Sequence, residues 1–130
     1  MELEQISFFR SASQRMEWLT ERQRVIASNM AHANTPAYKA QDVVPFETML
    51  EREPTRSLRV THERHLGGTY QSPVDVRADA NAWEVSLDGN SVVLEQQTIM
   101  ANQTFEQFSL ASQAYKKGHD LLTLALVGNR

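Results

Sequence analysis

The side chains of this sequence that could do chemistry include one close pair of histidines. His62 and His65 stand three residues apart, with Glu63 between them, and paired glycines follow soon after. A zinc-protease motif needs two histidines four residues apart on a helix, with a general-base glutamate between them. No third clustered ligand is present near this pair. The spacing therefore does not favour a metal site, although tight stoichiometric zinc in the purified protein would support a small metal-dependent hydrolase.

The remaining candidate residues are scattered along the chain. His32 and His119 fall on predicted helices, while Asp75, Asp79 and Asp88 have no spacing that would place them on one face. The sequence has no glycine-rich phosphate loop and no Gly-x-Ser-x-Gly turn, and it contains no cysteine. The absence of cysteine excludes disulfides, thiolate zinc sites and cysteine nucleophiles. We therefore predict no enzymatic activity, no cofactor, no metal and no small-molecule substrate.

Composition places the chain among folded proteins of ordinary character. Its 130 residues are 41% hydrophobic and 22% charged, which suits one domain or one helical module with an insertion. A net charge of -3 argues against a nucleic-acid partner. The first residues, MELEQISFFRSASQ, carry early acids and lack the apolar run of a secretory signal. Taken alone, these features predict a cytoplasmic protein, unless an export route without signal cleavage is used.

The N-terminal third predicts one long helix, from about Leu3 to Ala33. Apolar residues recur at alternating steps of three and four, and no glycine or proline interrupts them, which is typical of a coiled-coil seam. The seam consists of Phe9, Ala12, Met16, Leu19, Ile26, Met30 and Ala33, with Gln23 as one polar interruption. A helix of about 30 residues would be roughly 45 Å long, which points to a coiled coil or a helical assembly.

A specified stop follows this helix at Asn34-Thr35-Pro36. Asparagine tolerates the left-handed conformation that ends many helices, and proline restricts both itself and Thr35. Tyr38 then offers a large anchor with a polar tip. Two interpretations stay open: these residues simply end the helix, or they aim the chain at one fixed angle.

The middle of the chain predicts irregular structure with short elements. A short helix is expected at 45–50, with Pro45 in its first turn. The alternation of apolar and polar residues over 83–87, Trp-Glu-Val-Ser-Leu, predicts a short half-buried strand.

A second long helix is expected from Asn90 or Ser91, which would cap it after a turn at Gly89, to about Leu126. Its apolar residues lie seven apart: Leu87, Leu94, Ala101, Phe108, Tyr115 and Leu122. Its polar face is rich in uncharged amides and hydroxyls, which cost less to desolvate than charges. This face favours contact with other subunits over free solvated surface.

These elements predict a mainly α fold. Long N- and C-terminal helices form an antiparallel coiled-coil-like pair, with an irregular middle segment that contains short strands. The expected division is an N-terminal helix at 1–35, a middle segment at 36–88 and a C-terminal helix at 89–130.

The residues from Ile26 to Lys39, IASNMAHANTPAYK, resemble the N-terminal signature of bacterial flagellar rod and hook proteins. That signature has an Asn-Ile-Ala-Asn-like helix end followed by Ala-Asn-Thr-Pro-Gly-Tyr. Ala37 stands where those proteins usually have glycine, and alanine tolerates positive φ poorly, which argues against a left-handed residue there. Residues 88–95 resemble the turn that opens the family's C-terminal helix, and the short length resembles the proximal-rod members.

The resemblance implies a structural subunit of the flagellar basal-body rod, assembled by coiled-coil packing of its terminal helices into a drive shaft. That shaft transmits torque and lets export substrates pass. Family members are exported without a cleaved signal and assemble in the periplasm. The implied partners are other rod proteins, the rod-base adaptor, the inner-membrane ring and further copies of the chain. The alternative is a cytoplasmic coiled-coil adaptor or export chaperone, which leaves the exit at 34–38 unexplained.

We predict that the assembly interface draws on both helices and on the exit between them. The residues predicted to form it are Phe9, Met16, Leu19, Ile26, Met30, Asn34, Pro36, Tyr38, Leu94, Ala101, Phe108, Tyr115 and Leu122.

Overall fold

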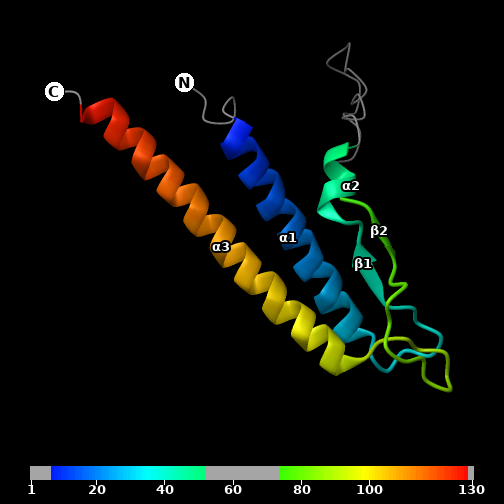
Figure 1. The fold of residues 1–130 in the computed structure, drawn as a ribbon. Coiled ribbons are helices and arrows are strands. Elements are labelled where there is room, and N and C mark those ends of the chain that lie inside the picture. The colour runs from blue at the N-terminus through cyan, green and yellow to red at the C-terminus, as the bar shows by residue number, and fades with distance from the viewer. Residues whose placement is uncertain (1–6, 52–73, 129–130) are drawn as a thin grey trace, which may run out of the picture.

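The protein is mainly helical, and two long helices lie side by side and antiparallel (Figure 1). The computed structural model describes residues 7–51 and 74–128. Its elements are α1 (Ser7–Ala31), β1 (Gln41–Val43), α2 (Phe46–Glu51), β2 (Val76–Ala78) and α3 (Leu94–Val127). The predicted fold class is confirmed, as is the short helix that begins after Pro45. Among the residues described, no helix has the length and apolar character that crossing a bilayer requires.

The start of α3 differs from the prediction. Gly89 has φ +85 and makes the expected turn, but the helix begins only at Leu94. The residue before it, Val93, is extended and provides no side-chain cap. The expectation that Asn90 or Ser91 caps α3 was therefore wrong, because both side chains are bonded elsewhere, as described below.

The predicted strand at Trp83–Leu87 is also absent. The two-stranded sheet instead pairs β1 with β2 in antiparallel register, with Val43 opposite Val76. Trp83 and Val85 keep 64% and 57% of their surface exposed, so the alternation over 83–87 does not mark a buried face. β1 packs on α1 and β2 pairs with β1, and residues 83–87 belong to neither strand.

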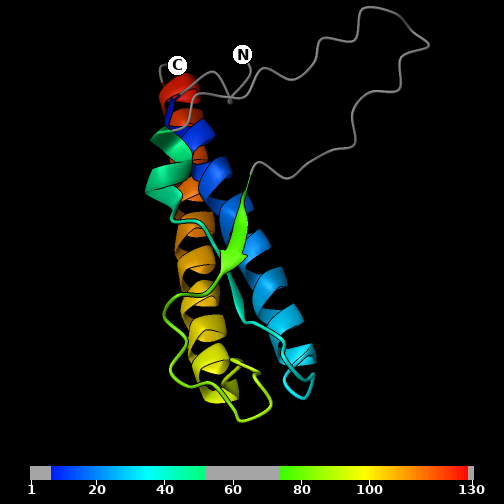
Figure 2. The same cartoon turned by 90° about the vertical axis from the view of Figure 1, so that its right-hand side faces the viewer.

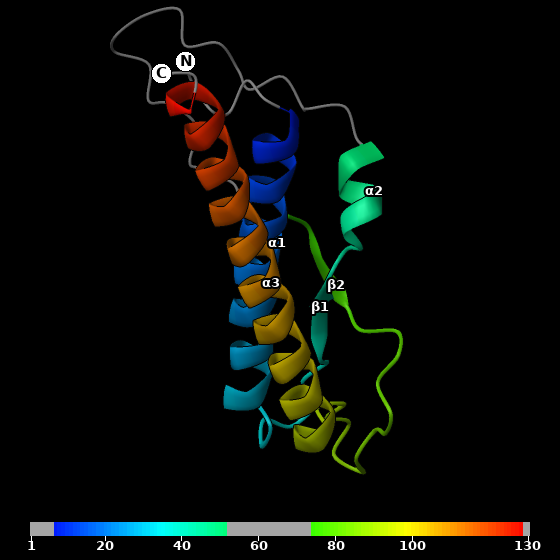
Figure 3. The same cartoon turned by 60° about the vertical axis from the view of Figure 1, so that its left-hand side comes forward.

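The antiparallel strand pair β1 and β2 is here called the hairpin, although α2 lies between the two strands in the chain. The hairpin and α2 cover α1 on the side seen from the front in Figure 2. The cluster beneath it consists of Trp18, Leu19, Val25, Val43 and Val74. Trp18 anchors the contact, because its indole Nε1 donates a hydrogen bond of 2.7 Å to the carbonyl oxygen of Val44. Arg22 adds an ion pair of 2.9 Å with Asp42. Figure 3 shows that these elements sit against α1 and leave most of α3 uncovered.

Aromatic rings join the two long helices at the end that holds the N-terminal part of α1. The rings of Phe9 and Tyr115 meet edge to face, with centroids 5.1 Å apart. Phe8 lies over Gly118, where an added Cβ would come within 2.7 Å of the Phe8 ring. Gly118, a weak helix former in the middle of α3, thus provides the space that this ring occupies.

Candidate assembly surface

The chain leaves α1 through a tight turn over residues 35–38. The amide of Tyr38 donates to the carbonyl of Thr35 at 3.3 Å, which places Pro36 and Ala37 at the two central positions. Ala37 has φ +59. Proline in the second position and positive φ in the third are the features of a type II turn, which favours glycine at the third position. The expectation that alanine argues against a left-handed residue here was therefore wrong.

A second turn, which precedes α3, holds Ala37 in this conformation. The amide of Ala37 donates to the carbonyl of Asp88 at 2.9 Å, and the amide of Ser91 donates to the carbonyl of Tyr38 at 3.0 Å. The Ser91 hydroxyl accepts a bond of 2.8 Å from the amide of Ala40. Gly89 lies against Ala37, where an added Cβ would be in van der Waals contact with the Ala37 Cα at 3.4 Å. The two turns therefore fix each other, and together they fix the angle at which the chain exits α1.

Replacing Ala37 with glycine is expected to stabilise the fold. A non-glycine residue in the left-handed region costs about 1–2 kcal/mol. Glycine gives back part of that gain, about 0.4–1 kcal/mol, because it makes the unfolded chain more flexible. We expect the free energy of unfolding in urea to rise by roughly 0.5–1 kcal/mol for Ala37→Gly. Ala114→Gly, at an exposed helical position, is the matched control and should lower it by about 1 kcal/mol. A loss of stability in Ala37→Gly would contradict the strain argument.

Asn90 caps the carboxyl end of α1. Its side-chain Nδ2 donates to the carbonyl oxygens of His32 at 2.9 Å, Ala33 at 3.0 Å and Thr35 at 2.8 Å. Its Oδ1 accepts a bond of 2.7 Å from the amide of Val92, and the residue is 3% exposed. These carbonyls follow Ala31, the last residue of α1, and those of His32 and Thr35 also accept backbone bonds of 3.0 and 3.3 Å, whereas a carbonyl past a helix end has no partner inside the helix. One side chain from the start of the last segment thus satisfies the end of the first helix.

Asn29 links α1, α3 and β1 from a fully buried position. Its Nδ2 donates to the carbonyl of Gln41 at 2.7 Å and to the side-chain Oε1 of Gln97 at 2.9 Å. Its Oδ1 accepts from the amide of Gln41 at 3.0 Å. Gln97 is also completely buried. Because buried amides are costly unless bonded, this pair specifies which residues of the two helices stand opposite each other.

Tyr38 and His32 form the outer wall of this network. Their rings are stacked, with centroids 4.5 Å apart and planes 5° from parallel. The Tyr38 hydroxyl donates to Asn29 Oδ1 at 3.4 Å. His32 Nδ1 lies 2.8 Å from the carbonyl oxygen of Ser28, so this nitrogen carries the hydrogen. His32 therefore packs against Tyr38 at the exit from α1.

The predicted interface residues fall into three groups by exposure. The first group is buried inside the chain: Phe9, Leu19 and Ile26. The second is half-buried: Met16, Tyr38, Ala101, Tyr115 and Leu122. The third is exposed: Met30, Asn34, Pro36, Leu94 and Phe108. The structure thus brings the first two groups together around the helix pair and its exit, and it leaves the third group on the surface.

The polar face of α3 needs a partial correction. Gln96 and Gln97 are buried within the chain, and Gln96 bonds the backbone of Asn81 and Trp83 at 3.0 and 3.2 Å. These two amides therefore serve the chain's own fold and not contact with other subunits. Further along the helix, Gln103 and Gln113 remain exposed.

The other candidate residues do not gather into a reactive cluster. Asp79 and Asp88 each accept a hydrogen bond from the backbone two residues ahead, as turn residues do. His119 is exposed, and the pair His62 and His65 lies outside the described residues. Within those residues, no group of three or more histidine, aspartate or glutamate side chains could hold a metal.

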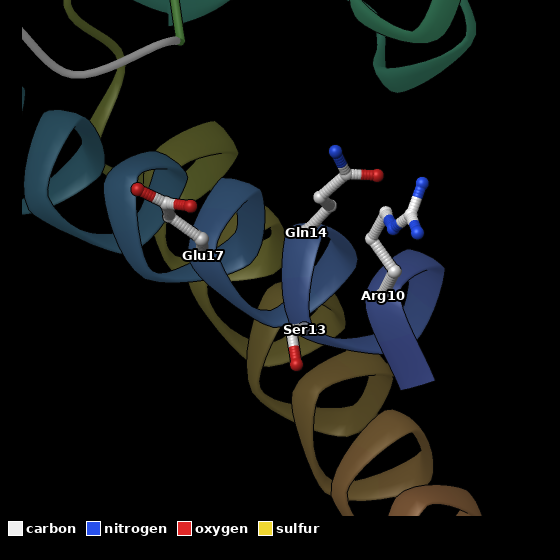
Figure 4. A pocket seen from close by; sticks show the side chains of 4 residues that line it. All are labelled: Arg10, Ser13, Gln14 and Glu17. Atoms are coloured by element: carbon white, nitrogen blue, oxygen red, sulfur yellow. The ribbon is translucent and has the colours of Figure 1, made fainter. Parts of the chain in front are cut away.

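A surface hollow of about 290 Å³ lies along α1 (Figure 4). The side chains that line it come from this one helix: Arg10, Ser13, Gln14 and Glu17. They offer a guanidinium, a hydroxyl, an amide and a carboxylate, a set that indicates no particular reaction.

Comparison with known proteins decides the family. No protein-family model matches the chain. The flagellar basal body rod protein FlgB of Agrobacterium fabrum (strain C58) is 31% identical over 128 residues, which cover 95% of this chain and 96% of that protein. The chain belongs to the FlgB family of flagellar basal body rod proteins. Because the similarity spans both long helices and the exit between them, FlgB family membership applies to the whole fold. It indicates a structural subunit of the rod.

Proposed function

We propose that this FlgB family member is a proximal-rod subunit that assembles by packing its two long helices against those of its neighbours. The observation that supports it, besides the similarity over nearly the whole chain, is the uncovered apolar surface of α3. Phe105 and Leu110 keep 70% and 69% of their surface exposed. Large apolar patches on a monomer mark interaction sites. In the assembled rod these helices form the drive shaft that transmits torque and lets export substrates pass.

The proposal also places the protein in the cell. The subunit leaves through the flagellar export apparatus without a cleaved signal and assembles in the periplasm. Its partners are copies of itself, other rod proteins, the rod-base adaptor and the inner-membrane ring. The exposed residues of the predicted interface, such as Met30 and Leu94, make these contacts directly. The buried ones, such as Ile26, act by shaping the helix pair.

Fractionation of cells tests this proposal. The chain should co-purify with detergent-extracted basal bodies, and a deletion strain should lose motility and regain it with the parent gene. Recovery in the cytosol alone, with no chain in basal bodies, would favour a cytoplasmic adaptor or export chaperone.

The exit turn is expected to matter for assembly more than for export. Pro36→Gly removes the fixed backbone angle at an exposed position, and Tyr38→Ala removes the ring stacked on His32. We expect both variants to be exported while their amount in basal bodies falls severalfold relative to the exported amount. Tyr38→Phe is the matched control, since it keeps the stacked ring, and it should assemble. An unchanged ratio in Pro36→Gly and Tyr38→Ala would mean that the turn only ends the helix.

A further inference from the structure

The side of the helix pair that faces away from the hairpin carries two parallel stripes without charge, here named the back groove. Each stripe repeats at alternating steps of three and four, so its members lie along one side of their helix. On α1 the stripe is Ser13, Met16, Thr20, Gln23, Ala27 and Met30, and Asn34 continues it past the helix end. On α3 it is Leu94, Thr98, Ala101, Phe105, Phe108 and Ser112.

Helical geometry places both stripes on the same side of the molecule. Residues two apart on a helix point in nearly opposite directions, because each residue turns about 100°. On α1, Ala27 is thus opposite Val25, which packs on the hairpin. On α3, Phe105 is opposite Gln107, whose Oε1 accepts a bond of 3.1 Å from Arg15 on the hairpin side. The stripes therefore border one groove between the helices.

Surface shape and exposure agree with this placement. At one end of the groove, a hollow of about 300 Å³ is lined by Asn34 from one stripe and Leu94 from the other, and also by the carboxylate side chains of Glu84 and Glu95. The large side chains along the groove are open to solvent, with exposed fractions of 40% for Met30, 47% for Leu94 and 70% for Phe105. A groove between two helices whose stripes carry no charge and present large apolar side chains at intervals suits a third helix.

A second apolar surface lies on the other side of α3, here named the α3 ridge. Ile99, Leu110 and Leu121 follow one another at steps of eleven residues, which is close to three helical turns, and Leu124 extends the line. Their exposed fractions are 46%, 69%, 59% and 67% in chain order. The ridge therefore presents a helix with large apolar side chains that no described part of the chain covers.

We propose that the back groove of one copy receives the α3 ridge of a second copy, in a head-to-tail contact. This inference rests on the proposed function and names the surfaces by which the subunit binds itself. The two surfaces lie on different sides of α3, so one chain cannot close them on each other. A symmetric groove-to-groove dimer would leave both ridges in water, whereas a head-to-tail contact covers both surfaces and repeats without closing. Their lengths also agree, because the ridge spans 99–124 and the α1 stripe spans 13–34.

Charge order favours one orientation of the incoming helix. The ridge carries Glu106 and then Lys117 along α3. The outer rim of the groove on α1 carries Arg24 and Glu17, met in that order when read in the direction of α3, which runs antiparallel to α1. Arg24 already bonds the Glu21 carboxylate in its own helix. If the two α3 helices run parallel, the incoming Glu106 lies nearer Arg24 and the incoming Lys117 lies nearer Glu17, with the two spacings, eleven and seven residues, differing by about one helical turn. Such exposed pairs set orientation more than affinity.

Cysteine cross-linking tests the pairing without background, because the chain contains no cysteine. Ala27→Cys labels the groove and Gln103→Cys labels the ridge, and both positions are exposed. The variants carry different tags, are expressed together in cells, and are treated with a short bifunctional maleimide in isolated basal bodies. We expect mixed covalent dimers from the pair and no dimers from either variant alone. Thr48→Cys, exposed on α2, is the control and should not link to Ala27→Cys.

Several outcomes overturn the inference. Dimers from Ala27→Cys alone would indicate a symmetric groove contact. A cross-linked product of another mass would show that a different protein fills the groove. Basal bodies that contain both variants without mixed dimers would refute the pairing and leave the proposed function intact. If the cells swim normally and their basal bodies do not contain the chain, the proposed function itself is refuted.

Discussion

Ile26→Asp is expected to disrupt the helix pair and abolish motility. Ile26 keeps only 1% of its surface exposed, and its neighbours on α1, Leu19 and Val25, are equally buried. A carboxylate at this position would lose its hydration in a site that an apolar side chain fills, and burying an unpaired charge costs several kcal/mol. Domains of this size are stable by about 5–15 kcal/mol, so the change consumes a large part of the total.

Far-UV circular dichroism of the purified chain and basal-body content in cells measure this effect. The helix signal of Ile26→Asp should be lost at a lower urea concentration than that of the parent, and the variant should be exported without entering basal bodies. Ser11→Asp places the same charge at an exposed position on α1 and should behave like the parent. Swimming at the parental rate by Ile26→Asp would show that the site is not packed in the working protein.

The large apolar residues were sufficient to predict the helix pair. Phe9, Leu19 and Ile26 repeat at helical spacing, and all three are buried. Burial of such side chains dominates the free energy of folding, so their periodicity reports the packed side directly. Trp18 was missed because it lies off that seam, on the second buried side of α1. Its partner seven residues on, Val25, was the available signal.

Half of the α3 seam escaped notice because it is built from small and polar residues. Gln97, Thr104, Ala111 and Gly118 are seven apart and interleave with Ala101, Phe108, Tyr115 and Leu122. Gln97 and Thr104 are buried, although hydropathy places them at the surface. Thr104 satisfies its hydroxyl by donating to the carbonyl of Met100 at 2.7 Å. Small residues let the two helices approach closely. Which polar residues of α3 become buried depends on where α1 lies, and the sequence of α3 alone does not show this.

The exit turn was predicted in place but not in mechanism. Asn34 was expected to end α1 in a left-handed conformation, yet the positive φ lies at Ala37, and Asn90 provides the donors from 55 to 58 residues away. A contact over such a sequence distance has no local pattern. The same holds for Ala37, whose positive φ depends on the bond from its amide to Asp88.

Asn90→Asp is expected to be among the most damaging single-atom changes in this protein. It keeps the size of the side chain and the oxygen that accepts from the amide of Val92, but it replaces the donor nitrogen with an oxygen. The carbonyl oxygens of His32, Ala33 and Thr35 then face a carboxylate in place of a donor. Leaving a buried polar group unsatisfied costs about 1–3 kcal/mol, and a buried charge beside acceptors costs more. We expect a loss of about 3 kcal/mol or more in the free energy of unfolding.

Asn34→Asp is the matched control, because it makes the same atomic change at an exposed asparagine beside the same helix end. It should leave both the urea midpoint and the basal-body content close to those of the parent. Asn90→Ala separates the two contributions to the damage, since it removes the donor without adding a charge, and it should fall between the parent and Asn90→Asp. Equal losses in Asn34→Asp and Asn90→Asp would mean that negative charge near the end of α1 is harmful by itself, through the helix dipole. A parental midpoint in Asn90→Asp would mean that the cap contributes nothing, and that the exit of α1 is held by the two opposed turns alone.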